Sequence, residues 1–116
     1  MKTIKPSELS PEPVEFNGEL IPGVTIRWLI KREDGADKFA MRYFEVEKDV
    51  LIPEHKHPWE HEIFILEGKA IITEGDEART VDAGTAVYIK PDAPHSYKNI
   101  GDGKLVFLCI IPYTKV

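Results

Sequence analysis

The chain has 116 residues, and its 20 acidic against 15 basic residues give a formal net charge of −5 at pH 7. This length is that of one domain with a modest core, and the acidic balance, with no basic run, argues against a nucleic-acid-binding surface. No apolar run approaches the roughly 20 residues that span a bilayer, and the first residues lack the apolar core of a signal peptide, so neither membrane insertion nor export is expected.

The N-terminal segment 1–22 is rich in proline, with Pro6, Pro11, Pro13 and Pro22. Proline fixes φ and has no backbone N–H, so the segment is expected to form an extended arm with turns rather than a long helix. Within it, Asn17-Gly18 is a typical two-residue hairpin turn. The arm is predicted either to pair with a second copy of the chain or to fold back on its own domain.

Beyond the arm, short runs rich in β-branched and aromatic residues alternate with turn signals, and no helical period is visible. The last run contains Cys109, the only cysteine, which excludes an internal disulfide and makes a reducing cytoplasm the expected location. This pattern favours an all-β barrel or sandwich in a single domain. Strands are expected over residues 24–30, 39–46, 63–66, 69–73, 79–81, 85–89 and 105–111, with a loop over 33–37 and a hairpin turn over 74–77.

All four histidines fall in two compact patches, residues 55–68 and 84–99. Neutral imidazole is the commonest protein ligand for divalent transition metals. Side chains alternate along an extended segment, so His55 and His57 are expected on one face. Two antiparallel strands side by side could bring all the rings to one point. We therefore predict one metal site made by His55, His57, His61 and His95; the alternative is four unrelated histidines.

The two patches resemble the two motifs of the cupin superfamily, small β-barrels that bind one metal. The first motif is His-x-His, three or four residues, Glu, six residues and Gly, which His55, His57 and Gly68 follow. The second begins with Gly and ends with His, three residues and Asn. Here Gly84 stands eleven residues before His95, and Asn99 stands four after it, as that pattern requires.

The departures from the motifs are informative. Seven residues before Gly68 the chain carries His61, where the family usually carries glutamate. Glu62 is the alternative, because it has the right gap after His57 but the wrong gap before Gly68; His61 is preferred. In the second motif Lys90 replaces a proline and Asp92 replaces a glycine, although Pro91 and Pro94 can still stiffen that turn.

The resemblance implies a double-stranded β-helix (jelly-roll barrel) formed by a single domain over 1–116, with the barrel core at about 40–111 and one metal inside. It also implies a homodimer, since cupins often pair through their N-terminal arms. Four neutral nitrogen donors would leave the metal its full charge, which makes it a stronger Lewis acid. Mn, Fe, Ni and Cu are the expected ions, with Zn as a further option.

If the ion is six-coordinate, two positions stay open for water, dioxygen or an oxygen-chelating substrate. The chain is therefore expected to be a small metalloenzyme acting on an oxygen-rich small molecule, dioxygenase-like or isomerase-like. The alternative is a non-catalytic cupin that binds or senses a small ligand, because a fold does not fix a function.

Four further residues are candidates for lining the pocket: Arg42, Trp59, Phe107 and Cys109. Arg42 could neutralise an anionic substrate, although a surface ion pair is the commoner role. Phe107 and Cys109 are more often simple core, and Trp59 either gates the barrel or caps it. Tyr97 is a possible proton donor or a packed rim residue, and Glu60 and Glu62 either orient ligand histidines or are plain exposed carboxylates.

Overall fold

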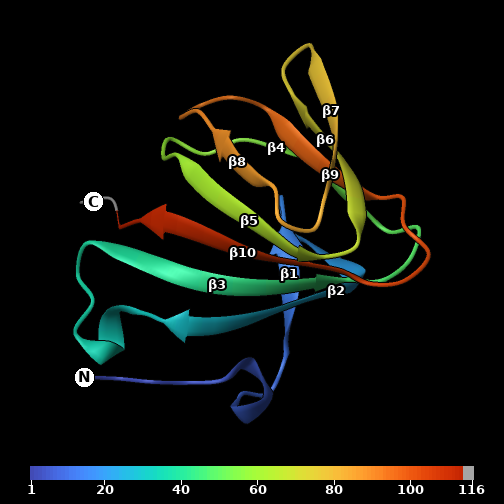
Figure 1. Cartoon of the computed structure of the whole chain (residues 1–116). Coiled ribbons are helices and arrows are strands. Elements are labelled where there is room, and N and C mark those ends of the chain that lie inside the picture. The colour runs from blue at the N-terminus through green and yellow to red at the C-terminus, as the bar shows by residue number, and fades with distance from the viewer. Residues whose placement is uncertain (114–116) are drawn as a thin grey trace.

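The structure, a computed structural model, describes residues 1–113, which form an almost purely β architecture (Figure 1). Two single turns of 3-10 helix are the exceptions, η1 (Pro6–Glu8) and η2 (Arg32–Asp34). In this part of the chain no helix has the length and apolar character needed to cross a membrane. The strands are β1 (Glu12–Phe16), β2 (Glu19–Ile30), β3 (Phe39–Val46), β4 (Leu51–His55), β5 (His61–Glu67), β6 (Lys69–Glu74), β7 (Glu77–Asp82), β8 (Ala86–Ile89), β9 (His95–Asn99) and β10 (Leu105–Pro112).

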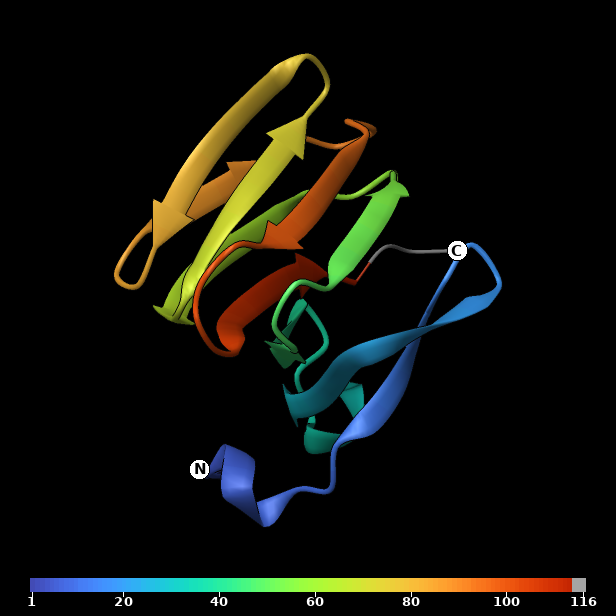
Figure 2. The same cartoon turned by 90° about the vertical axis from the view of Figure 1, so that its right-hand side faces the viewer.

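The strands form two antiparallel sheets. One has six strands in the order β1-β2-β3-β10-β5-β8, and the other has four in the order β4-β9-β6-β7. The sheets face each other and enclose the core, as the two views in Figures 1 and 2 show. This confirms the expected all-β, double-stranded β-helix.

Strand β10 lies in the middle of the larger sheet, between β3 and β5. Side chains alternate across a strand, and the inward positions of β10 are Leu105, Phe107, Cys109 and Ile111, none more than 8% exposed. Full burial of an apolar side chain of this size stabilises the fold by about 1.5–3 kcal/mol. Burial of these side chains therefore anchors β10, and with it the inward-facing Phe107 and Cys109, in the centre of the sheet.

The N-terminal arm pairs with its own chain. The hairpin turn expected at Asn17-Gly18 is present, with φ of 54° and 81°, and it joins β1 to β2. Strand β2 runs from the hairpin turn at Glu19 through Pro22 to Ile30, so it joins the second strand of the hairpin to the strand expected over 24–30. The β1–β2 register shifts between Pro13 and Glu15, so Pro22 lies opposite an interrupted stretch of the ladder, where a missing N–H is tolerated. Pairing of the arm with a second copy, and hence the homodimer, stays a prediction.

Most other expected elements lie within two residues of the observed ones, and 39–46 coincides with β3. The loop expected over 33–37 begins inside η2. Strand β9 was not anticipated, because its sequence His-Ser-Tyr-Lys-Asn mixes polar and charged residues. Its alternate positions are buried, and this alternation is the strand signal that the low hydrophobicity hides.

Candidate metal centre

His55 and His95 are register partners on the antiparallel strands β4 and β9, and their ring centroids lie 4.2 Å apart. In each ring Nδ1 lies 2.8 Å from a backbone carbonyl oxygen two residues earlier, that of Pro53 for His55 and that of Ala93 for His95. A carbonyl oxygen only accepts hydrogen bonds, so each Nδ1 carries the proton and each Nε2 keeps its lone pair. Both rings are therefore fixed in the tautomer that binds a metal through Nε2.

His57 brings a third ring from the loop between β4 and β5. The candidate ligand atoms of His55, His57 and His95 all lie within 4.8 Å of one another, close enough to share one ion. The His57 ring is held from its other side by Trp59, whose ring stacks on it at 4.4 Å with an interplanar angle of 3°. The antiparallel strands thus deliver two donors and the following loop delivers the third.

His61 approaches the same point from the opposite sheet, as the first residue of β5. It is 3% exposed, and its ring centroid lies 4.7 Å from that of His95 and 5.3 Å from that of His57. Its Nδ1 is buried and has no hydrogen-bond partner within residues 1–113. The group of three converging donors does not include His61, so its role as fourth ligand stays a prediction.

Burial keeps these histidines neutral. The pKa of His55 falls from 6.5 to about 4 and that of His61 to about 3; burial is the largest cause of both shifts, and the neighbouring histidines and Arg42 contribute to them. Burial is also the largest cause of the lowered pKa of His57 and of His95. A metal binds the unprotonated imidazole, so at neutral pH each ring is in its ligand form.

This donor set fits a divalent transition metal. Imidazole nitrogen suits Zn, Cu, Fe and Ni, and two buried nitrogens, Nε2 of His95 and Nδ1 of His61, have no hydrogen-bond partner in the described part of the chain. A buried polar atom without a partner costs on the order of 1–3 kcal/mol. An ion among the rings would remove that cost, and His55, His57 and His95, with His61, are the residues that would hold it.

A small cavity opens beside the rings. Its volume is only about 20 Å³, room for about one solvent molecule. Of the four pocket candidates, Arg42, Phe107 and Cys109 line this cavity and Trp59 does not. The lining consists of Phe16, Arg42, Phe44, Ile52, His55, His57, His61, Tyr97, Phe107 and Cys109.

A family model described as a cupin domain matches residues 42–111, more than half of the chain. This chain belongs to the cupin family. The match begins within β3 and ends within β10, so it contains both histidine patches and most of the two central strands of the larger sheet.

Solved structures with the same fold carry different activities in their names. The polyketide cyclase RemF from Streptomyces resistomycificus is 33% identical to this cupin, with a TM-score of 0.87 over 97% of this chain and 79% of that one. A predicted oxalate decarboxylase from Thermotoga maritima is 23% identical, with a TM-score of 0.82 over 97% of this chain and 100% of that one. The second likeness shows the fold alone.

Among curated proteins, an uncharacterised protein of Methanocaldococcus jannaschii is 43% identical over 56 residues. The matched segment is 47% of this cupin and 45% of that relative, so the similarity spans less than half the length of either protein.

The cavity candidates in this cupin occupy distinct positions. Phe107 is 2% exposed and stacks on Phe44 at 5.0 Å between ring centroids. Tyr97 is also buried, 5.6 Å from the ring of His95, rather than packed on the rim as the commoner alternative would have it. Trp59 lies behind His57, where it caps the ring, and its buried Nε1 has no partner within residues 1–113.

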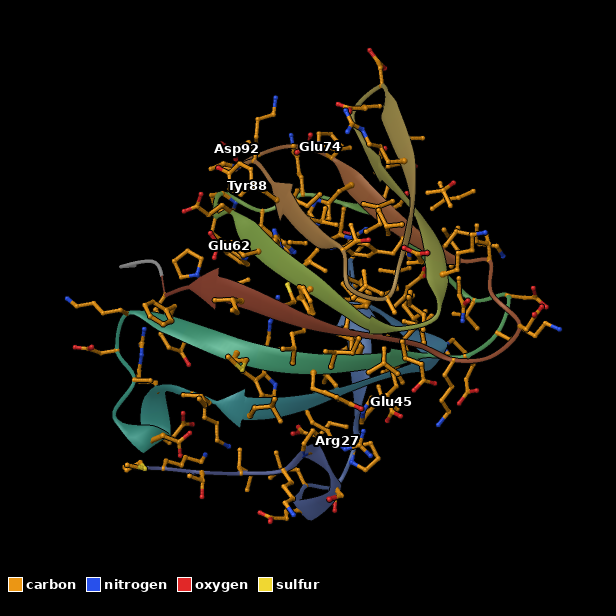
Figure 3. All side chains as sticks on the ribbon, viewed as in Figure 1. Arg27, Glu45, Glu62, Glu74, Tyr88 and Asp92 are labelled. Carbon is orange, nitrogen blue, oxygen red and sulfur yellow. The ribbon has the colours of Figure 1, made fainter. Side chains whose placement is uncertain are left out.

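The carboxylates Glu60 and Glu62 point away from the rings. Both are exposed; Glu60 accepts a hydrogen bond from the Tyr88 hydroxyl at 2.8 Å, and Glu62 lies near the start of β5 (Figure 3). The suggestion that they orient ligand histidines is therefore wrong for His55 and His95, whose Nδ1 atoms are held by backbone carbonyls. The bond between an imidazole and the carbonyl two residues earlier gives no signal in the sequence.

One cavity residue was missed, and one motif residue has a role that the sequence did not indicate. Phe16 comes from the arm, lines the cavity and lies 4.5 Å from the ring of His55; nothing local in its sequence indicates this. Asn99, fully buried, donates from Nδ2 to carbonyl oxygens of Val46, Glu47 and Gly103 at 2.9–3.0 Å. The asparagine of the second motif therefore hydrogen-bonds the end of β3 to the loop before β10 and has a structural role in this chain.

Proposed function

We propose that this cupin is a metal-dependent enzyme that holds one divalent transition metal with His55, His57, His61 and His95. Its substrate is a small oxygen-rich molecule with an acidic C–H next to a carbonyl group, and its reaction is proton transfer of the isomerase or cyclase type. The observation that carries the proposal is the pair of imidazoles fixed by carbonyls of Pro53 and Ala93, which leaves their Nε2 lone pairs free.

The likeness to RemF favours proton transfer over dioxygen chemistry. That protein is called a polyketide cyclase, and cyclisation of a chain of ketones proceeds by forming an enolate at one carbonyl and adding it to another. The identity of 33% extends over almost all of this chain.

When bound, the metal would supply Lewis acidity that stabilises negative charge on a substrate oxygen. The chain's own residues do the rest. Phe16, Phe44 and Phe107 line the cavity and exclude bulk water, which strengthens electrostatic interactions inside it. Burial raises the pKa of Tyr97 well above its usual value, so its phenol stays protonated and can hold a proton beside the rings.

The test starts from protein purified without added metal, analysed for its elemental content. Preparations loaded with Mn, Fe, Ni, Cu or Zn are then incubated in deuterated water with diketones and diols. We expect deuterium to enter the C–H position of a diketone with at least one metal, and no oxygen uptake. Tight ligand binding without exchange would favour the non-catalytic cupin, and oxygen consumption would favour the dioxygenase.

A further inference from the structure

Arg42 is an inward-facing charge in an apolar strand. On β3 the side chains of Ala40, Phe44 and Val46 are buried on the inner face of the sheet, at 0–4% exposure, and Arg42 shares their face by the period of two. Its neighbours across the ladder are Cys109 on β10 and Trp28 on β2. The guanidinium is thereby directed into the cavity that the histidines line.

The contacts of Arg42 do not balance its charge. One nitrogen, Nη2, donates to Cys109 Sγ at 2.9 Å, and the guanidinium lies over the rings of Phe44 and Trp28 at 5.1 and 5.6 Å. Nε is buried and has no partner within residues 1–113. No Asp or Glu in that part of the chain forms an ion pair with Arg42.

Another arginine of the same sheet shows the usual solution. Arg27 on β2 pairs with Glu45 on β3 (Figure 3) and also donates to the carbonyl oxygen of Leu9. A charged group away from water is normally compensated in this way, by a partner of opposite charge. Arg42, in contrast, has no partner of opposite charge within residues 1–113.

Cys109 does not supply the missing negative charge. Burial raises the pKa of its thiol above the usual value, and this outweighs the opposing effect of Arg42. At neutral pH the group beside Arg42 is therefore a neutral thiol. The cavity lining contains no Asp or Glu, so Arg42 is its one permanent charge, and a divalent ion among the histidines would add two more of the same sign.

We infer that Arg42 anchors an anionic oxygen group of the ligand, a carboxylate or an enolate, which lies between the guanidinium and the histidine cluster. An anion there satisfies Nε of Arg42 and balances positive charge on both sides, and N–H to oxyanion bonds are among the stronger hydrogen bonds in proteins. The inference rests on the proposed function, since it places the anion next to the metal, and it names the substrate class as one that binds in anionic form.

The experiment uses the full chain loaded with cobalt(II), whose absorption bands report ligand exchange. Acetate tests whether the ligand group is a carboxylate, and acetylacetone tests whether it is an enolate. The neutral control is 3,3-dimethylpentane-2,4-dione, which cannot form an enolate between its two carbonyl groups. We expect at least one anion to bind the wild-type protein and to bind Arg42→Met at least about tenfold more weakly. Arg27→Met, which removes the arginine paired with Glu45 and outside the cavity lining, should bind like wild type.

The results separate the two proposals. Arg42→Met must still bind cobalt, with equal or greater affinity, because it removes a positive charge near the ion. Equal anion binding by wild type and Arg42→Met, or no effect of either anion on wild type, overturns the inference while the metal site stands. Absence of cobalt binding by wild type overturns both. Should Arg42→Met not fold, Arg42→Gln, which keeps N–H donors without the charge, is expected to show the same loss of anion binding.

Discussion

His55 and His95 are opposite residues on neighbouring strands. The Nδ1 atom of each ring lies 2.8 Å from the backbone carbonyl oxygen two residues earlier in the sequence, and this contact orients the ring. The same local geometry thus occurs twice in one site. Because backbone carbonyls rather than carboxylates hold these two rings, burial is the largest cause of the lowered pKa of every ring, and Glu74 opposes it only at His95.

The adjacent residues His61 and Glu62 offer a matched test of the fourth ligand. His61 faces inward and is 3% exposed, whereas Glu62 is exposed. His61→Ala should lower metal affinity by at least about tenfold, the effect typical of removing a group that holds a metal, and Glu62→Ala should change it less than threefold, on the order of 0.5 kcal/mol. Competition with a chromophoric chelator measures both, and the reverse pattern would assign the ligand position to Glu62.

Alanine substitutions at Gly68 and Gly84 test whether the two motifs need glycine for backbone conformation alone or also for space. Both have positive φ, 93° and 91°, which costs an alanine roughly 1–2 kcal/mol. At Gly68 a Cβ would also lie 2.6 Å from the carbonyl oxygen of Lys104, whereas at Gly84 no atom lies within 4 Å. Gly68→Ala should therefore destabilise the fold by at least about 2 kcal/mol and clearly more than Gly84→Ala, as measured by urea unfolding. Equal losses would show that only backbone strain matters at both positions.

How much of this site is predictable from sequence depends on the range of each interaction. The meeting of His55 with His95 follows from the period of two and from two motifs that fix where strands end. The inward position of Arg42 follows from the same alternation, but its lack of a carboxylate partner depends on how β3 pairs with β2 and with β10, which is far away in sequence. The approach of Phe16 depends on where the arm's hairpin docks, and no local pattern encodes that.

Replacement of Asn99 should lower the stability of the fold without changing its metal affinity. Its side chain is completely buried and contacts three backbone carbonyl oxygens, while its Oδ1 accepts from the N–H of Gly101 at 3.0 Å. Asn99→Ala leaves several of these groups unsatisfied and should cost about 2–4 kcal/mol in the free energy of unfolding. At a temperature where the variant is folded, its metal affinity should equal that of wild type. Weakened binding by folded Asn99→Ala would place this asparagine among the groups that shape the metal centre.

The metal-free protein should lose stability as the pH falls below 6.5. The folded-state pKa values of His55 and His61, about 4 and about 3, lie below the ordinary value of 6.5, so between these limits the unfolded chain binds protons that the folded chain does not. Stability from each ring is therefore complete above pH 6.5 and declines on acidification through that window. One such group changes the free energy of unfolding by at most about 1.4 kcal/mol per pH unit, and water reaching the cavity reduces this to roughly half.

Because carboxylates also titrate in the lower part of this window, the informative quantity is a difference. His61→Leu removes one buried imidazole and keeps the apolar volume, so it should be stabilised relative to wild type by about 1–2 kcal/mol more at pH 4.5 than at pH 6.5. Urea unfolding of both metal-free proteins at the two pH values measures this. Parallel stability curves would mean that His61 takes up its proton at the same pH in the folded and the unfolded chain, so that burial does not hold this ring neutral between pH 4.5 and 6.5.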